Sequence, residues 1–295
     1  FNLRHGLKNP RWMLSFLNNC RPSRVKHISQ ALGEFLRHAD RGLDPLIAEA
    51  KAHDLIVSND CLYVWSSRSG YESAAASNAM RASQGVEFDD LSPDDVRKLE
   101  PNLQQPIHRG LRFKGARHMT NPQELVRRMQ LRFEALGGVY LPRRVDRCQP
   151  DATGVTVHLA DNTQVRGGRL ALTAGARSHQ ITGTGAEHLP LGTERGYHVL
   201  YRNHGALVSR PVGWAEAGFY ATPMADGLRI AGTVEINAID AVFNTKCTDY
   251  LQQKSNQMFG ALGAPDDTWL GHRPTMPDSL PVIGHSGSSR RVICA

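Results

Sequence analysis

The segment from Gly271 to Gly284, with the sequence GHRPTMPDSLPVIG, constrains the fold of this chain more than any other stretch. Gly271 frees the backbone, whereas Pro274 and Pro277 fix the φ angle and remove backbone donors. We therefore predict that a strand ends here and passes into a loop with limited freedom and a set direction.

Arg273 lies inside this constrained segment. A guanidinium held in one place presents a planar fork of donors that suits a carboxylate. The segment therefore predicts a holder for an acidic ligand group. The alternative is a surface arginine beside a turn, and the segment alone leaves both interpretations open.

Four segments, in order, resemble one enzyme family. Gly271–Gly284 is similar to the signature RPxTPDGLPxIG of FAD-dependent amino-acid oxidoreductases, the group containing D-amino-acid dehydrogenase, glycine oxidase and sarcosine oxidase. The other three segments are HMTNPQELVRRM (His118–Met129), LALTAGARS (Leu170–Ser178) and TERGYHVLY (Thr193–Tyr201). In the first two, Asn121 stands where the family commonly has Asp, and Arg177 stands where it commonly has Trp. The TERGYH form of the third resembles the D-amino-acid dehydrogenase branch most.

The resemblance implies a two-domain fold of mixed α+β and α/β class. A partial Rossmann-like FAD domain would be joined to an antiparallel-sheet substrate domain, and the chain would pass between them more than once. The expected divisions are a helical segment adjoining the FAD domain (1–52), substrate domain (53–116), FAD-binding domain (117–190), substrate domain (191–272) and the C-terminal part of the FAD domain (273–295).

A GxGxxG turn, which opens this family's FAD domain, occurs nowhere in the sequence. Its glycines let the backbone approach the FAD pyrophosphate at a helix N-terminus. The similar GTGAEH, from Gly183 to His188, lacks the third glycine and runs into Pro190, so we predict a loop. At the other end, RVICA (Arg291–Ala295) is typical of a strand that, in the family, leads into a flavin-closing turn. The resemblance therefore predicts a chain truncated at both ends.

The resemblance also implies a substrate site. Arg273 matches the position that pairs with the substrate carboxylate, and Tyr220 matches one that often donates a hydrogen bond to it. Tyr197 and His198 belong to the ERGYH match. Tyr220 could instead be an aromatic side chain packed in the core. His198 could be a packed histidine of the strand and not a catalytic base, since the family's chemistry needs no strong base.

The cofactor implied is FAD. A bulky side chain at the turn that follows the strand LALTA would keep the backbone from the cofactor. The main chain of Val145 matches an adenine-side contact, and a later segment matches the strand beneath the isoalloxazine ring. The remaining cofactor-binding candidates are Thr173, Ala174, Gly175, Pro281, Val282, Ile283 and Gly284.

Composition narrows the function classes. With 295 residues and 40% hydrophobic residues, the chain can bury a sizeable core. It contains no apolar run approaching the ~20 residues of a membrane span and no signal-peptide pattern. We expect a cytoplasmic protein, with inner-membrane association left open through an electron acceptor that is either oxygen or a respiratory carrier.

Neither metals nor nucleic acids are expected partners. The five cysteines form no CxxC pair and the thirteen histidines form no HExxH motif, so we predict neither a metal site nor a disulfide framework. The net charge of +7 comes from dispersed basic residues. The densest patch, Arg127–Arg132, is predicted to be a solvated helix face.

Periodicity predicts the order of elements. Two or three helices occupy Pro10 to Ala52, with Pro22 and Pro45 as punctuation. A hairpin turn is expected at Ala225–Gly227. Further helices are expected at 71–84, after Ser92, after Asn121 and at 247–262, and strands at 61–67, 86–88, 110–116, within 139–174, within 198–235 and after 262.

Three functions remain open from the sequence. The first is oxidative deamination of D-amino acids to 2-oxo acids and ammonia, a reaction of amino-acid catabolism, by hydride transfer to the flavin. The second is oxidation of glycine, sarcosine or another secondary amine. The third is a noncatalytic remnant that binds an acidic ligand or a partner. Missing strands would expose sheet edges and apolar surface, so we also predict that the isolated chain is poorly stable or self-associates.

Overall fold

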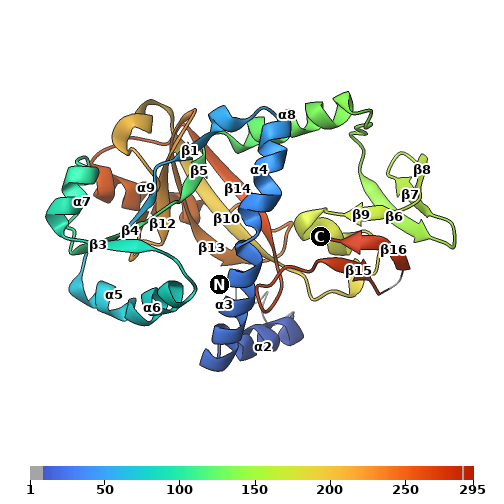
Figure 1. Ribbon diagram of the computed structural model, residues 1–295, viewed down its shortest axis with the longest axis horizontal. Helices are drawn as coiled ribbons and strands as arrows, with labels where there is room; N and C mark the ends of the chain where they lie inside the picture. The colour runs from blue at the N-terminus through green and yellow to red at the C-terminus, as the bar shows by residue number, and fades with distance from the viewer. Residues whose placement is uncertain (1–8, 288) are drawn as a thin grey trace.

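Helices dominate the N-terminal part of the chain, and strands dominate the rest. A computed structural model describes residues 9–287 and 289–295. The helices are α2 (Pro10–Asn19), α3 (Pro22–Leu36), α4 (Ala39–Glu49), α5 (Arg68–Ser73), α6 (Ala75–Ser83), α7 (Pro93–Leu99), α8 (Pro122–Ala135) and α9 (Thr245–Phe259). Within the described residues the strands form four sheets, and helices α5, α6 and α7 lie at one end of the molecule (Figure 1).

The largest sheet has eight strands in the order β14-β10-β13-β12-β11-β2-β4-β3. Its strands come from two distant parts of the sequence, which meet where β11 pairs in parallel with β2. All other pairs in this sheet are antiparallel. The strands are β2 (Cys61–Trp65), β3 (Phe88–Leu91), β4 (Arg109–Phe113), β10 (Gly192–Tyr201), β11 (Val212–Trp214), β12 (Phe219–Met224), β13 (Gly227–Ile236) and β14 (Asp267–Thr275).

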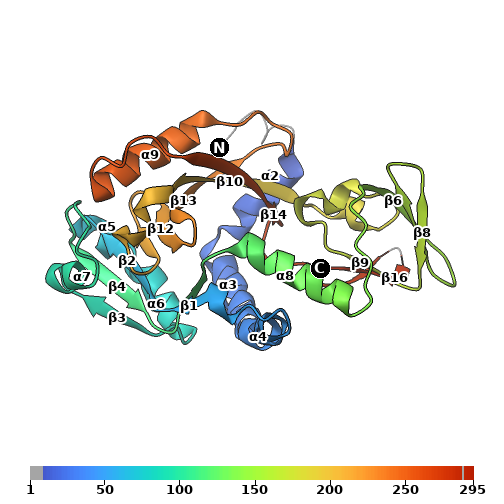
Figure 2. The same ribbon diagram turned by 90° about the horizontal axis from the view of Figure 1, so that it is seen from above.

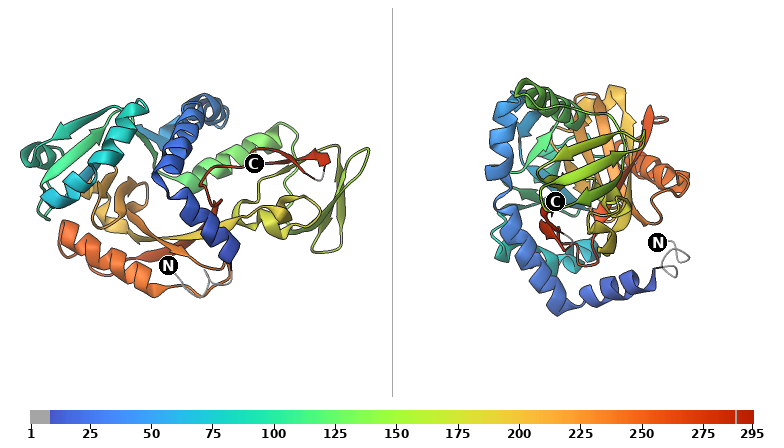
Figure 3. Two further views of the ribbon diagram at one scale, coloured as in Figure 1. Left: turned by 90° about the horizontal axis from the view of Figure 1, so that it is seen from below. Right: turned by 90° about the vertical axis from the view of Figure 1, so that its right-hand side faces the viewer.

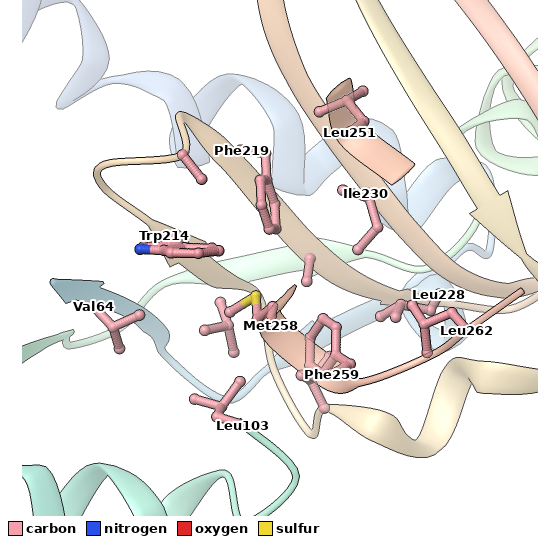
Figure 4. Packing of buried hydrophobic residues seen from close by; sticks show 14 of the residues in the cluster. Val64, Leu103, Trp214, Phe219, Leu228, Ile230, Leu251, Met258, Phe259 and Leu262 are labelled. Atoms are coloured by element: carbon pink, nitrogen blue, oxygen red, sulfur yellow. The ribbon is translucent and has the colours of Figure 1, made fainter. Parts of the chain in front are cut away.

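The main hydrophobic core lies between this sheet and α9. Alternate residues of β10, namely Tyr197, Val199 and Tyr201, point into it and are at most 1% exposed. From α9, Leu251 and Met258 reach the same cluster, which Figure 4 shows at close range. Because side chains alternate along a strand, the intervening residues of β10 point to the opposite face of the sheet.

A second, smaller sheet contains a parallel strand pair. Its order is β15-β16-β9, in which β16 runs parallel to β9 and antiparallel to β15. A three-stranded antiparallel sheet, β6-β7-β8, lies next to it (Figure 1), and β1 pairs with β5. The bounds are β1 (Ile56–Ser58), β5 (Arg117–Met119), β6 (Val145–Pro150), β7 (Val155–Leu159), β8 (Gln164–Gly167), β9 (Leu170–Leu172), β15 (Gly284–Ser286) and β16 (Ser289–Cys294).

The N-terminal helices lie between the large sheet and the smaller sheets. Figure 2 shows α9 on one side of the large sheet and α3 and α4 on the other, and Figure 3 shows α2 and α3 crossing between the two strand regions. Helices α2 and α3 bury no residue completely. Several large apolar side chains also stay exposed, among them Leu36 (54%), Phe133 (53%) and Leu136 (68%). The self-association expected from the sequence stays a prediction.

The local sequence signals for helix starts are confirmed. Ser92 caps α7 in a capping box with Asp95, and Asn121 caps α8 by accepting from the backbone of Glu124 at 3.0 Å. The hairpin turn predicted at Ala225–Gly227 is confirmed, with Ala225 and Asp226 as the turn residues and Gly227 as the first residue of β13. The segment Gly183–His188 is confirmed as a loop with a short 3-10 turn, since Gly183 and Gly185 both have positive φ angles.

Several predicted boundaries were wrong. The helix expected over 71–84 is two helices that meet at Ala74, and the strand expected over 86–88 is β3, which begins at Phe88. Pro45 lies within α4 rather than between helices. Residues 281–283 match a strand in the family, but here they form no regular secondary structure. Ser279 turns the chain at a φ of 59°, and Pro281 cannot donate a hydrogen bond to a neighbouring strand.

None of the helices in the described part of the chain is both long and apolar enough to cross a lipid bilayer. The five cysteines are all free thiols. Within residues 9–287 and 289–295, no three His, Cys, Asp or Glu side chains gather in a way that could hold a metal ion.

Candidate active site

Arg273 lies near the end of β14, on the face of the large sheet opposite the core. Its direct cross-strand partner is Glu194 of β10. A Cβ atom built on Gly196 would lie 2.6 Å from Nη2 and 2.7 Å from Cζ of Arg273, so the guanidinium rests on the backbone of that glycine. We call this side of the sheet the Arg273 face. The Arg273 guanidinium therefore lies against the sheet at Gly196, although the residue as a whole is exposed.

Two glycines, paired across strands, form the floor of this region. Gly196 of β10 lies opposite Gly271 of β14. The guanidinium of Arg273 covers Gly196, and the indole of Trp269 covers Gly271, where a Cβ atom would lie 2.2 Å from the ring. Only residues without a side chain leave room for both groups. The role of Gly271 is therefore to seat an aromatic ring beside the arginine.

Gly196→Ala is expected to weaken carboxylate binding about tenfold, without unfolding the protein. The new methyl group displaces the end of a flexible side chain, which relaxes more easily than backbone, and charge-assisted hydrogen bonds of this kind contribute about 1.5–3 kcal/mol. Isothermal titration with propanoate measures the effect. Gly42→Ala, where a Cβ atom meets nothing within 4 Å, is the matched control. Equal affinities for Gly196→Ala and wild type would contradict the arrangement.

Arg273 opens into a pocket of about 490 Å³, here called the Arg273 pocket. It lies between α3, the ends of β9 and β16, and the loop that follows β14. Of the residues predicted from the sequence, it gathers Arg273, Gly175, Pro281 and Val282, and it excludes the other candidates. Its apolar wall comes from α3 (Leu32, Phe35, Leu36) and from Leu172, Ala186, Leu189, Leu191, Met276 and Leu280.

One side of the Arg273 pocket is the carboxyl end of the parallel pair β9 and β16. The two strands end together, and the amide of Ala295 donates to the carbonyl of Leu172 at 3.0 Å. Thr173 and Ala174 follow β9 and are exposed, and Gly175 has a φ of 57° with open space around it. Nucleotide cofactors bind at such strand ends, so this turn has the open backbone that a dinucleotide requires.

The other predicted cofactor residues are spread over two elements. Gly284 begins β15, whereas Ile283 precedes it and is 59% exposed. Val145 begins β6 and packs at the edge of a small cluster with Cys148 and Val292. The structure therefore brings Val145 close to the β9 and β16 region but not into the Arg273 pocket.

Tyr220 lies on the Arg273 face but outside the Arg273 pocket. It sits on β12, three strands from β14, which corresponds to roughly 14 Å across the sheet. Its ring stacks on Tyr63 with centroids 5.6 Å apart, and both rings cover Gly213. Burial raises the pKa of Tyr220 to about 12, so its hydroxyl stays a donor at neutral pH. Its predicted role toward a substrate carboxylate remains a prediction.

Tyr197 and His198 point to opposite faces of the sheet. Tyr197 is buried on the core side, where its hydroxyl donates to Glu235 Oε2 at 2.6 Å. The structure therefore does not bring Tyr197 to the Arg273 pocket. His198 is on the Arg273 face and stacks on Trp269, with ring centroids 5.0 Å apart. Burial, aided by Arg229, lowers the pKa of His198 to about 4, so the ring is neutral at pH 7.

The neutral state of His198 gives a stability prediction. Its folded pKa of about 4 lies below its ordinary value of 6.5, so the unfolded chain binds the proton more readily. Stability is therefore lost as the pH falls from about 6.5 towards 4. His198→Gln is expected to reduce this loss, measured by urea unfolding at pH 7.5 and 5. His53→Gln, at an exposed histidine, is the control, and a loss as steep in His198→Gln as in wild type would refute the assignment.

Sequence reasoning missed three residues of this region. Glu194 and Gly196 lie within the TERGYH segment, next to the residues that were chosen, and the two-residue alternation along β10 could have placed both on the face opposite Tyr197. Tyr63 pairs with Tyr220 through contacts between strands that are far apart in sequence. No local signal identifies such a partner.

Comparison with known proteins points to one enzyme family. A family model described as FAD dependent oxidoreductase (DAO) matches residues 3–295. A D-amino-acid oxidase from Bradyrhizobium diazoefficiens is 29% identical over 96% of this chain and 69% of its own length. A D-amino acid dehydrogenase from Dechloromonas aromatica is 24% identical over 93% of this chain and 69% of its own.

A solved structure supports the fold. Glycine oxidase from Geobacillus kaustophilus superposes with a TM-score of 0.74, covering 94% of this chain and 74% of its own, at 16% sequence identity. At that identity the likeness concerns the fold alone, and it agrees with the mixed α+β and α/β fold class expected from the sequence. Because the family model covers nearly all of the sequence, the chain belongs to the DAO family of FAD-dependent oxidoreductases.

Proposed function

We propose that this protein catalyses the FAD-dependent oxidative deamination of D-amino acids to 2-oxo acids and ammonia. The observation that carries the proposal is Arg273, whose guanidinium has no carboxylate partner among the described residues and rests on Gly196 inside the Arg273 pocket. A fixed, unpaired guanidinium suits a substrate carboxylate. The similarity to a D-amino-acid oxidase and a D-amino acid dehydrogenase supports this substrate class.

The chain's own residues would orient the substrate. Arg273 binds the carboxylate and so sets the direction of the α-carbon–hydrogen bond, while the apolar wall of α3 limits water in the pocket. FAD, when bound, would supply the acceptor for the hydride of the α-carbon. The amine loses a proton as its nitrogen forms the C=N bond, and water then hydrolyses the imino acid to a 2-oxo acid and ammonia.

We propose that the cofactor lies at the open ends of β9 and β16. We assign Thr173, Ala174 and Gly175 to backbone contacts with FAD, since their turn is exposed and Gly175 carries no side chain. The segment Pro281–Gly284 would lie against the flavin, and the main chain of Val145 would lie near the adenine. Strands from residues 53–116 and 191–272 share the large sheet, which supports assigning both segments to the substrate domain.

The cellular setting belongs to the proposal as well. We place the protein in the cytoplasm, and inner-membrane association depends on whether oxygen or a respiratory carrier reoxidises the flavin. Comparing reoxidation of the reduced protein by oxygen and by a soluble quinone distinguishes the two acceptors. Faster reoxidation by the quinone supports the dehydrogenase branch, and faster reoxidation by oxygen supports an oxidase.

A visible absorption spectrum tests the function directly. The 295-residue chain is incubated with FAD, separated by gel filtration and mixed anaerobically with D-alanine, glycine or sarcosine. Retained flavin that bleaches fastest with D-alanine is the expected result. Faster bleaching with glycine or sarcosine would favour the amine-oxidase alternative. Colourless protein, or flavin that none of the three substrates bleaches, would refute the proposal and favour a noncatalytic binding protein.

A further inference from the structure

A carboxylate lies beside Arg273 and does not neutralise it. Glu194 and Arg273 are direct partners in the antiparallel pair of β10 and β14, and both line the Arg273 pocket. Opposite charges at such positions usually contact one another. Here, within the described residues, neither side chain takes part in an ion pair or donates or accepts a side-chain hydrogen bond. The pocket therefore presents two separate charges of opposite sign.

The position of Gly196 explains the separation. The Arg273 guanidinium lies over Gly196, two residues along β10 from Glu194, instead of extending directly across to the carboxylate. Glu194 is half-buried, so its unpaired carboxylate is only partly compensated by water. A ligand with both a positive and a negative group would compensate both charges at once.

We propose that Glu194 binds the ammonium group of the substrate while Arg273 binds its carboxylate. This inference rests on the proposed function and adds the substrate property that the pocket recognises, the zwitterion. In an α-amino acid the two charged groups sit on one carbon, and Glu194 and Arg273, which are direct cross-strand partners, line the same pocket. Glu194 is thereby a specificity-determining residue.

The assignment predicts effects of opposite sign on two ligands. D-alanine and propanoate differ only by the ammonium group. Glu194→Gln removes the partner of that ammonium, and it also removes a negative charge that repels the carboxylate of propanoate. The variant should therefore bind D-alanine more weakly and propanoate more tightly. A purely structural role for Glu194 would weaken both ligands together.

The experiment uses the full chain reconstituted with FAD. The KM for D-alanine comes from anaerobic flavin reduction, and the Kd for propanoate comes from isothermal titration. We expect Glu194→Gln to raise the KM about tenfold, as for the loss of one charge-assisted hydrogen bond, and to lower the propanoate Kd severalfold. Glu134→Gln, which removes an exposed carboxylate on α8, is the matched control and should change neither value.

Each other result overturns the assignment in a recognisable way. If Glu194→Gln weakens both ligands equally, Glu194 supports the fold of the pocket and does not read the ammonium. If neither constant changes, Glu194 does not reach the ligand. If wild type reduces flavin with D-alanine but Glu194→Gln gives one of these two results, only this inference fails. If wild type binds neither ligand, the proposed function fails and the inference fails with it.

Discussion

Arg273→Leu is expected to lower kcat/KM for D-alanine by on the order of 100-fold or more. A bidentate guanidinium–carboxylate pair contains two charge-assisted hydrogen bonds, each contributing about 1.5–3 kcal/mol, and each 1.4 kcal/mol is about a factor of ten. Part of that loss should fall on kcat, because the carboxylate contact also orients the α-carbon. Anaerobic flavin reduction over a range of D-alanine concentrations separates the two constants.

Two controls make this result specific to the pocket. Arg273→Lys keeps the charge but loses the planar fork, so it should recover only part of the activity. Arg97→Leu removes an exposed arginine of α7 and should leave kcat/KM unchanged. Flavin content must be the same in all variants. An Arg273→Leu protein with full flavin and nearly wild-type kcat/KM would place the substrate elsewhere.

Arg195→Met is expected to destabilise the protein by about 3–5 kcal/mol, because it leaves a charge without its partner in a largely buried site. Arg195 is completely buried, and its Nη1 forms an ion pair with Glu235 Oε2 at 3.0 Å. This contact does not have the geometry of a hydrogen bond. Its Nη2 donates to the carbonyls of Ala241 and Val242 at 2.9 and 3.0 Å. Equilibrium unfolding in urea measures the change.

A double variant tests the cause of that loss. Adding Glu235→Gln to Arg195→Met removes the uncompensated carboxylate, so part of the lost stability should return. A double variant less stable than Arg195→Met alone would show that packing, and not charge, is responsible. Glu72→Gln at an exposed carboxylate is the control.

The pH dependence of stability follows from Glu235. Burial alone would raise its pKa, but hydrogen bonds from Tyr197 and Asn237, the charge of Arg195 and a bond from Asn244 together hold the pKa below the ordinary value of 4.5. The folded state therefore keeps this carboxylate charged more readily than the unfolded state. The resulting stability is present above about pH 4.5 and is lost as the pH falls through the folded pKa. Glu235→Gln should lack that acid-side loss.

Local elements of the fold could be predicted from sequence because their causes are local. Pro93 after Ser92 and Pro122 after Asn121 mark helix starts through capping and a fixed φ angle, and both starts are where the sequence indicated. Boundaries failed where the competing signals were of similar strength, as at Ala74, which joins two short helices. Pro45 misled the prediction because a helix can tolerate a proline when other contacts support it.

The candidate site was only partly predictable. Arg273 was chosen because it lies in a constrained segment that resembles the family's signature, and Gly175 because it lacks a side chain in a turn that resembles the family's; both line the Arg273 pocket. Tyr197 was chosen with them, but strand alternation turns it into the core. Tyr63 had no local signal at all, because it reaches Tyr220 only through the parallel pairing of β2 and β11.

By itself, the sequence determined the helix starts, the strand that ends in a constrained loop, and an arginine held near that end, since backbone restrictions act over a few residues. Only the tertiary structure decided which groups share a site. The pairing of β10 with β14 sets Glu194 beside Arg273, and the bare backbone of Gly196 keeps the guanidinium from closing onto that carboxylate. Cross-strand register depends on contacts between distant segments, and so it cannot be read from any one of them.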